Sequence, residues 1–483
     1  MSELESRAVK GVLWTIIQAL GARALSLLVF VVLARLLTPA DFGLVAMAGV
    51  FIVLLEVLVQ QGFSAAITQR ENLEPDHEST AFWSNIALSA FVGAALWASA
   101  GWVAKLYDAP ELVSVVRWLS LVLPLRALVA VPVGLLQRRL EFRALAIRSI
   151  LGAFVGGVSG VAAALAGWGV YALVVQQILG GLAEVLAVWG AAAWWPRLAF
   201  SVRHLRELLG FSLHLVSASI LDFLNRRSDD FLIGLFLGEV ALGYYAVAYR
   251  VLTVLTQVMA KTGTVVAFAA FSRLQGQPDR MRDAFYRSTQ ASSVVATPVF
   301  VGLSVLAPTA VPLIFGEKFA ESGVVLQILA LIGVVHAVSY YNFAVYVGSS
   351  RPDIRLKLLA IHTTVNVLAF FLVVRWGIIA VAAAYVIRAY VLIPLDLIAL
   401  RSLIGVSPRR YFANLVPALF STAVMVVAIL VVQQLPIGPV AQLLPSVLLG
   451  AAVYSVTLFL VAPALVRELW SKVNLMLSRQ AAS

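Results

Sequence analysis

The sequence predicts an all-α polytopic membrane protein of about fourteen transmembrane helices. Composition, a series of apolar segments and the placement of basic residues support this prediction. The 483-residue chain is 61% hydrophobic and 12% charged, with a mean hydropathy of +0.96. Soluble globular chains are about half apolar and about a quarter charged. The composition therefore excludes an ordinary soluble domain.

The apolar segments account for most of the chain. A helix needs about 20 mostly apolar residues to cross a bilayer. Candidate spans cover residues 11–33, 43–66, 81–104, 114–136, 149–167, 170–195, 212–236, 241–262, 288–309, 323–347, 358–374, 378–400, 413–433 and 441–463. The longest connection is about 25 residues, at 263–287. No connection is large enough for a nucleotide-binding or catalytic domain, which excludes a single-chain ATP-driven exporter. It also argues against polymerases and ligases with a large external loop.

Basic residues predict the orientation, because Lys and Arg gather in cytoplasmic loops. With a cytoplasmic N-terminus, the cytoplasmic segments hold 23 Lys and Arg residues and the opposite side holds four. Both termini are therefore predicted to be cytoplasmic, which requires an even number of spans. We interpret the net charge of +11 as loops facing anionic lipid rather than as nucleic-acid binding. The chain contains no cysteine, which excludes disulfide scaffolds and thiolate metal sites.

An internal repeat divides the chain. The segments "LLTPADFGLVAMA" (36–48) and "FLGEVALGYYAVA" (236–248) align without a gap and share one glycine and two alanines. Later, "GWGVYAL" (167–173) matches "RWGIIAV" (375–381) in the same order. Parallel repeats are typical of transporters. We therefore expect two six-helix bundles of the same topology, followed by two additional helices. The predicted domains are 1–208, 209–402, and 403–483, the last including a cytoplasmic tail.

The repeat also decides how to interpret "SILDFLNRRSDDFLIGLFLG" (219–238), which carries five charged residues between apolar runs. If 236–248 corresponds to the loop after span 1, then 212–236 corresponds to span 1 itself. The alternative, a single span at 231–255, breaks the repeat and reverses the orientation of every later segment. We therefore place the charged residues inside the seventh helix, at membrane depth.

Two stretches, "ARLLTPADFGLVA" and "LIGLFLGEVALGYYAVAYR", together with fourteen spans, resemble the polysaccharide transporter branch of the multidrug/oligosaccharidyl-lipid/polysaccharide exporter superfamily. This branch contains the Wzx-type flippases and exporters. The resemblance covers the whole chain and does not indicate the particular glycan. It implies two six-helix bundles around a central cavity that opens alternately to each side. It also implies a polyprenyl-pyrophosphate-linked oligosaccharide as substrate.

The seventh helix supplies the main candidate site. A charged side chain at the centre of a bilayer costs roughly 2.5–3.5 kcal/mol on insertion scales, so such residues face a partner, a cavity or water. Asp222, Arg226 and Asp230 follow an i, i+4, i+8 spacing along one face. The other polar residues are Asn225, Arg227 and Asp229. The functional interpretation is a cavity wall that offers Arg226 and Arg227 to a pyrophosphate. The structural one is a ladder of salt bridges that fixes the helix.

Further polar residues lie in other predicted helices. Arg250 lies deep in the eighth helix, whereas Lys261 is near its cytoplasmic end and either lines the cavity or reaches the interface. Glu56, at the middle of the second helix, either carries a coupling proton, because burial favours the neutral carboxyl, or pairs with Arg23 of the first helix. Arg23 is also a candidate head-group ligand.

Two further pairs follow from the repeat. Arg126 of the fourth helix and His336 of the tenth are equivalent at an offset of 210 residues. Arg126 is a candidate head-group ligand, and His336 either lines the cavity or packs. Glu184 and Arg388 lie in the counterpart helices 6 and 12, and we interpret both as members of structural ion pairs.

The sequence therefore predicts a non-enzymatic flippase or exporter in the bacterial inner membrane. It contains no Walker A, H-E-x-x-H or G-x-S-x-G motif, and we expect no cofactor. The expected partners are the lipid-linked oligosaccharide, membrane lipid and glycan polymerase or export machinery. Two alternatives stay open: a drug/cation antiporter of the same superfamily and a membrane enzyme of glycan assembly. The deep set of six basic and five acidic residues favours an anionic substrate only slightly.

Overall fold

The computed structural model describes residues 21–60, 67, 74–274, 276–436, 438–468 and 471. Of residues 60, 207–218, 260–270, 272–273, 347 and 352, only the backbone is described. The described part is built from helices joined by short turns and contains no strand. The all-α prediction is therefore confirmed for this part of the chain.

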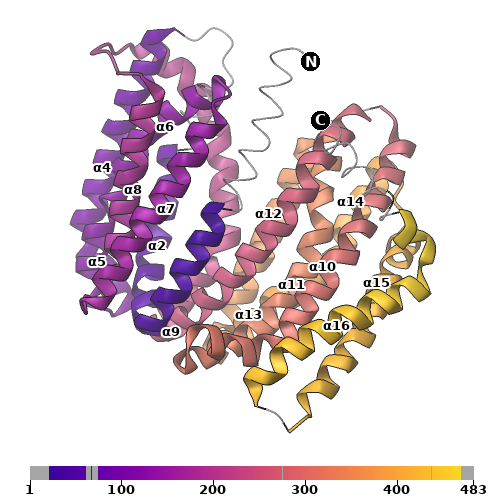
Figure 1. Cartoon of the computed structure of the whole chain (residues 1–483). Coiled ribbons are helices and arrows are strands. Elements are labelled where there is room, and N and C mark those ends of the chain that lie inside the picture. Colours follow the sequence, from indigo (N-terminus) through magenta and orange to yellow (C-terminus); the bar gives the residue numbers. More distant parts are fainter. Residues whose placement is uncertain are drawn as a thin grey trace. The chain divides into compact units, whose positions relative to one another are not determined.

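The helices follow one another along the whole described chain (Figure 1). Residues 21–36 are helical. The helices after them are α2 (Pro39–Gln60), α4 (Pro75–Tyr107), α5 (Leu112–Leu119), α6 (Val122–Arg138), α7 (Phe142–Leu165), α8 (Tyr171–Ala192), α9 (Val202–Arg273), α10 (Pro278–Phe315), α11 (Ala320–Gly348), α12 (Pro352–Val373), α13 (Ile378–Val391), α14 (Ile393–Ile404), α15 (Pro408–Gln433) and α16 (Pro439–Val461). Two 3₁₀ turns, Glu317–Phe319 and Val374–Trp376, precede α11 and α13.

Twelve helical stretches of the described residues are long and apolar enough to cross a membrane. The protein is thus a multi-pass membrane protein. One of the twelve, Ser219–Met259 in α9, covers parts of two predicted spans. The first predicted span, 11–33, is described only from residue 21. The number fourteen therefore stays a prediction.

The helix α9 changes direction at Gly238. Its φ of 81° and ψ of −177° lie in a region of backbone conformation that is essentially restricted to glycine. The residues on both sides are helical, so α9 consists of two helices that meet at this residue. The turn falls between the two predicted spans, 212–236 and 241–262.

Several predicted boundaries are wrong. The expected loop at 263–287 is mostly helix, because α9 continues to Arg273 and α10 begins at Pro278. The predicted spans 114–136 and 378–400 each contain a break between two helices, but each lies within one stretch long and apolar enough to cross a membrane, Leu112–Arg138 and Ile378–Ile404. Hydropathy locates only the apolar centre of a helix, and polar turns at its ends extend beyond that centre. The start of α14 fits a proline in its first turn, where the missing N–H removes no helical hydrogen bond.

The described residues divide into two compact units. The first contains residues up to Val247 together with Asn366–Ile378. In it α4 packs against α6, α6 against α8, and α7 against α8, so these helices run side by side (Figure 1). Small residues permit the α7–α8 contact, since a Cβ on Gly156 would meet the backbone of Gln176 and Gly180.

The second unit contains Ala248–Val365 and the chain from Ile379 onward. Here α10 packs against α11 and α15, and α15 packs against α16. Aromatic and aliphatic side chains fill the space between α10, α11, α14 and α15, including Phe285, Tyr341, Val345 and Leu400. The predicted domain limits at 208 and 402 are a separate division of the chain and stay a prediction.

The two repeat segments contact each other inside the first unit. A Cβ on Gly43 would overlap the backbone of Glu239, and a Cβ on Gly243 would overlap the backbone of Pro39. Both the two glycines and the two residues they meet are 200 positions apart. The contact is therefore reciprocal, which supports the alignment of the two segments.

The second pair of repeat motifs also occupies equivalent places. Gly169 lies between α7 and α8, and Gly377 lies between α12 and α13. Both have a positive φ, 52° and 96°, which glycine adopts without steric strain. The preceding Trp168 and Trp376 are exposed, as expected for tryptophans at a membrane–water interface.

Candidate translocation site

The polar stretch of the seventh predicted helix is helical throughout. Residues 219–237 of α9 form a continuous helix that ends at Gly238. The interpretation of this stretch as a loop between two apolar segments is therefore wrong. The structure places its polar side chains in two different environments, one half-exposed and one buried.

Two adjacent aspartates form the buried part. The side chain of Asp230 is 4% exposed, and its Oδ2 accepts a hydrogen bond from Arg227 Nη1 at 2.6 Å. Asp229 is 2% exposed, and its Oδ2 accepts a hydrogen bond from the hydroxyl of Tyr245 at 2.7 Å. Tyr245 belongs to the part of α9 beyond Gly238. The buried Asp229 carboxylate therefore connects the two parts of this helix.

The half-exposed part consists of Arg226 and Asp222. Arg226 Nε lies 2.8 Å from Asp222 Oδ2, and the side chains are 66% and 48% exposed. Of the predicted ladder of salt bridges along Asp222, Arg226 and Asp230, only the first pair is observed. Asp222 and Arg226 pair at i, i+4, but Asp230 pairs with Arg227 at i, i+3. The reason is that Asp230 points into the buried side of the helix, where Arg227 reaches it.

Asn225 has a partner that sequence reasoning missed. The Nδ2 of Asn366, on α12, donates to the backbone carbonyl of Asn225 at 2.8 Å and lies 3.4 Å from its Oδ1. Asn366 is fully buried. The available signal was the one amide side chain in the predicted span 358–374. Tyr245 was missed as well, although it stands inside the repeat motif.

A second polar cluster links four helices of the first unit. Arg126 of α6 lies 3.4 Å from Glu56 of α2 and 3.5 Å from Glu184 of α8. Arg148 of α7 lies 3.7 Å from Glu184. The chain of two arginines and two glutamates is electrically balanced. Glu56 thus pairs with Arg126. From the sequence we expected Arg126 only as a ligand for the substrate head group.

The other predicted residues are Arg23, Arg250, Lys261 and His336. Arg23 is half-buried in the helix at 21–36, and Arg250 is exposed on α9. The side chain of Lys261 lies outside the described residues. His336 contacts the ring of Tyr385 edge to face, with centroids 6.3 Å apart.

Arg388 belongs to a separate polar chain in the second unit. It is 8% exposed, and its Nη1 lies 3.4 Å from His362 Nδ1. His362 Nε2 in turn lies 3.4 Å from Asp396. Glu184 and Arg388 are therefore both members of polar chains, in agreement with the structural role expected for them.

This succession of membrane helices belongs to a known transporter fold. The structure is similar to that of lipid II flippase MurJ in an inward closed conformation, with a TM-score of 0.78. The match covers 94% of this chain and 100% of MurJ at 14% sequence identity. At this identity the likeness shows the fold, so the protein is a multi-pass membrane protein with the fold of a transporter.

The chain belongs to the polysaccharide biosynthesis protein family, whose model matches residues 32–324. It is 30% identical over 318 residues to succinoglycan biosynthesis transport protein ExoT of Rhizobium meliloti, a match covering 66% of this chain and 64% of ExoT. It is 26% identical over 439 residues to lipopolysaccharide biosynthesis protein WzxC of Escherichia coli, covering 88% of this chain and 87% of WzxC. These relatives confirm the resemblance to the polysaccharide transporter branch.

Proposed function

We propose that this protein moves a polyprenyl-pyrophosphate-linked oligosaccharide from the cytoplasmic to the periplasmic leaflet of a bacterial inner membrane. The glycan serves lipopolysaccharide, capsule or exopolysaccharide synthesis. Membership of the polysaccharide biosynthesis protein family is the observation that carries this proposal. The names of ExoT and WzxC, which refer to succinoglycan transport and lipopolysaccharide biosynthesis, agree with it.

The proposed topology has fourteen spans, with two six-helix halves at 1–208 and 209–402, two further helices, and both termini in the cytoplasm. The reciprocal contact of Gly43 and Gly243 supports two related halves. The turn at Gly238 supports two spans within α9. On this topology the two halves move about a central site and expose it to each side in turn.

A labelling experiment tests this topology, because the natural chain contains no cysteine. Glu141 and Glu111 are both exposed and belong to connections on opposite sides of the proposed membrane. In whole cells, an impermeant maleimide is expected to label Glu111→Cys and to leave Glu141→Cys unlabelled until the cells are lysed. Labelling of Glu141→Cys in intact cells contradicts the proposed orientation.

The substrate's pyrophosphate would bind the half-exposed arginines of α9. Arg226 already holds a carboxylate, Asp222, and a phosphate oxygen is the same kind of hydrogen-bond acceptor for a guanidinium. An arriving pyrophosphate would therefore exchange with Asp222. Arg227, Arg250, Arg126 and Arg23 are the further candidates for the head group. The oligosaccharide would occupy the cavity beside them, while the polyprenyl tail stays in lipid.

Alanine at both Arg226 and Arg250 is expected to reduce surface glycan at least tenfold in a strain that lacks the natural gene, because two guanidinium contacts to the pyrophosphate are lost. A charged hydrogen bond contributes about 1.5–3 kcal/mol. The measurement is surface glycan, normalised to the amount of protein in the membrane. Arg117→Ala is the matched control. It also removes an arginine, but this guanidinium lies over the Trp97 ring at 4.6 Å and is not a candidate for the head group. Unchanged export by the double variant removes these arginines from the mechanism.

The sequence contains no ATP-binding motif, so the proposed energy source is one other than ATP hydrolysis by this chain. It would be an ion gradient, the membrane potential or the removal of product by glycan polymerase or export machinery on the far side. The same complementation strain separates this proposal from the antiporter alternative. Drug resistance without a glycan phenotype in a drug-sensitised host would favour an antiporter.

A further inference from the structure

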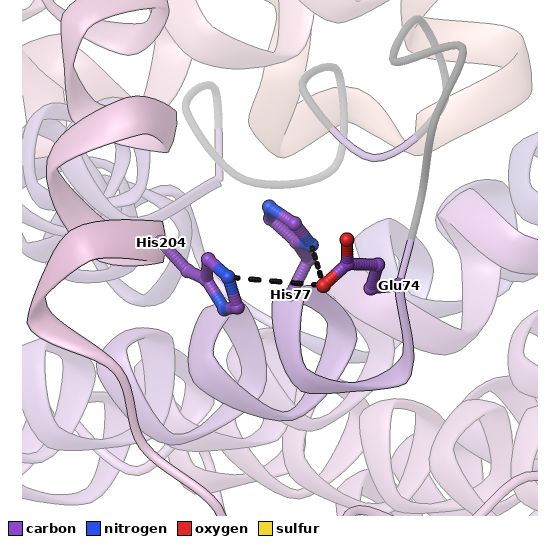
Figure 2. Close-up of side chains that lie close together, drawn as sticks. All are labelled: Glu74, His77 and His204. Carbon is purple, nitrogen blue, oxygen red and sulfur yellow. Dashed lines mark ion pairs between the residues drawn. The ribbon is translucent and has the colours of Figure 1, made fainter.

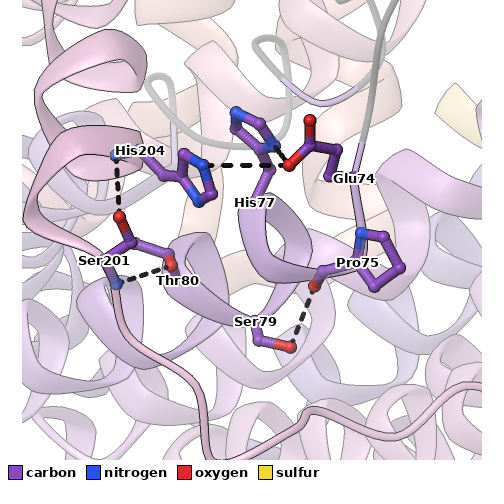
Figure 3. Close-up of polar contacts among 7 residues, drawn as sticks. All are labelled: Glu74, Pro75, His77, Ser79, Thr80, Ser201 and His204. Carbon is purple, nitrogen blue, oxygen red and sulfur yellow. Dashed lines mark hydrogen bonds and ion pairs between the residues drawn. The ribbon is translucent and has the colours of Figure 1, made fainter.

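The connection between α8 and α9 is hydrogen-bonded to side chains in the first two turns of α4. The backbone N–H of Arg197 donates to Ser79 Oγ at 3.0 Å, and that of Ser201 donates to Thr80 Oγ1 at 3.2 Å. Trp194 Nε1 donates to the carboxylate of Glu78 at 2.6 Å. Figure 3 shows how Ser201 brings the start of α9 against the start of α4.

Three side chains with metal-binding atoms meet where these two helices begin. Glu74 precedes the first residue of α4, His77 lies in its first turn, and His204 lies in the first turn of α9. Glu74 Oε2 is 4.0 Å from His77 Nδ1 and 3.9 Å from His204 Nε2. Figure 2 shows both rings directing a nitrogen toward this oxygen.

The two histidine rings pack against each other. The two imidazole rings are stacked, with centroids 3.8 Å apart and planes 22° apart. His77 is 3% exposed and the His204 side chain 16% exposed, whereas the Glu74 side chain is 67% exposed. Two imidazoles are thus held inside the protein, and the carboxylate covers them from the solvent side.

The separations fit metal ligands better than hydrogen bonds. A hydrogen bond between nitrogen and oxygen spans about 2.7–3.2 Å, and both distances here are longer. Ligands at 2.0–2.2 Å from a tetrahedral Zn²⁺ ion lie about 3.4 Å from one another. The ligand atoms of all three side chains lie within 4.8 Å of one another. Side-chain adjustments of roughly an ångström would bring them onto one ion.

We propose that Glu74, His77 and His204 bind a divalent transition metal ion of the Zn²⁺ type. Two imidazole nitrogens and one carboxylate oxygen form a donor set that such ions take in proteins. Water completes the coordination from the exposed side of Glu74. The ion joins the first turn of α9 to the first turn of α4.

The ion would fix the beginning of the helix that carries the candidate translocation site. Its ligands lie at the starts of α4 and α9, so it would restrain how α9 leaves the first bundle. On the proposed topology this end faces the cytoplasm. Metal binding itself does not depend on the proposed function, and its test uses no glycan readout.

The test measures zinc binding by the full-length protein in detergent, purified with a tag that contains no histidine. After treatment with a chelator and dialysis against Zn²⁺, the natural protein is expected to hold one zinc ion per chain, with a Kd of about 1 µM or tighter. His204→Gln and Glu74→Gln are each expected to weaken binding at least tenfold. Asp76→Asn removes a charge from the same turn of α4 without touching the cluster, and is expected to bind as tightly as the natural protein.

Thermal unfolding supplies a second readout. An ion that binds the folded protein stabilises it, so Zn²⁺ is expected to raise the unfolding temperature of the natural protein and of Asp76→Asn, but not of His204→Gln. Glu74 is largely exposed, so Glu74→Gln is expected to fold normally. If His204→Gln does not fold, the zinc affinity of Glu74→Gln still tests the proposal. Equal zinc content in the natural protein and Glu74→Gln, or no binding by the natural protein, overturns the proposal.

Discussion

Replacing Asp230 by alanine is expected to abolish glycan export and to lower the amount of folded protein in the membrane. The side chain of Asp230 is 4% exposed and holds the Arg227 guanidinium at 2.6 Å. Removing one member of a buried ion pair costs about 3–5 kcal/mol, because the other charge is left uncompensated. Since the Arg227 side chain is 40% exposed, we expect the lower end of this range.

The measurement is the yield of monodisperse protein by size-exclusion chromatography, together with surface glycan. Asp222→Ala is the matched control, because the side chains of Asp222 and Arg226 are 48% and 66% exposed. Exposed pairs contribute about 0–1 kcal/mol, so this variant is expected to fold normally. The double variant Arg227→Met/Asp230→Leu is expected to recover folding but not export. Normal yield and export by Asp230→Ala would contradict a role for the buried pair.

The second large effect is expected at the reciprocal glycine contact. Alanine at Gly43 or at Gly243 would put a methyl group into the backbone of Glu239 or of Pro39. Backbone atoms cannot move aside as a flexible side chain does, so the two segments must separate. Overpacking of this kind typically costs about 1–3 kcal/mol, and we expect export to fall at least tenfold for each variant.

Gly49→Ala provides the control for this experiment. Gly49 lies on α2, like Gly43, but a Cβ there would meet no atom within 4 Å. It is expected to keep normal export and a normal unfolding temperature, since alanine favours a helix by about 1 kcal/mol over glycine. Thermal unfolding in detergent and surface glycan are measured for all three variants. If Gly43→Ala and Gly49→Ala behave alike, the contact is not tight in the working protein.

The helical architecture follows from the sequence because hydropathy and span length are local properties. Each predicted span lies mostly on helix where it is described, and the repeat correctly predicted that 219–236 is helical. Helix ends and breaks were less predictable. The division of the predicted span 114–136 into α5 and α6 interrupts an apolar run, and hydropathy carries no signal for such a break.

The placement of the α9 charges on a helix was predictable, whereas their pairings were not. The charges of α9 were found because charged residues are rare in membrane helices. Which aspartate pairs with which arginine depends on the side of the helix that is buried, and that depends on neighbours far away in the sequence. Asn366, which is 141 residues from Asn225, illustrates this dependence. So does the pairing of Glu56 with Arg126.

The contact between the two repeat segments has the geometry of a symmetric dimer interface. Gly43 meets Glu239 while Gly243 meets Pro39, with the same offset of 200 residues for both partners. In a two-fold interface, residue i of one copy meets residue j of the other, and j meets i. Because both segments belong to one chain, the contact does not depend on concentration, and each segment can carry different charged residues around the same backbone contact.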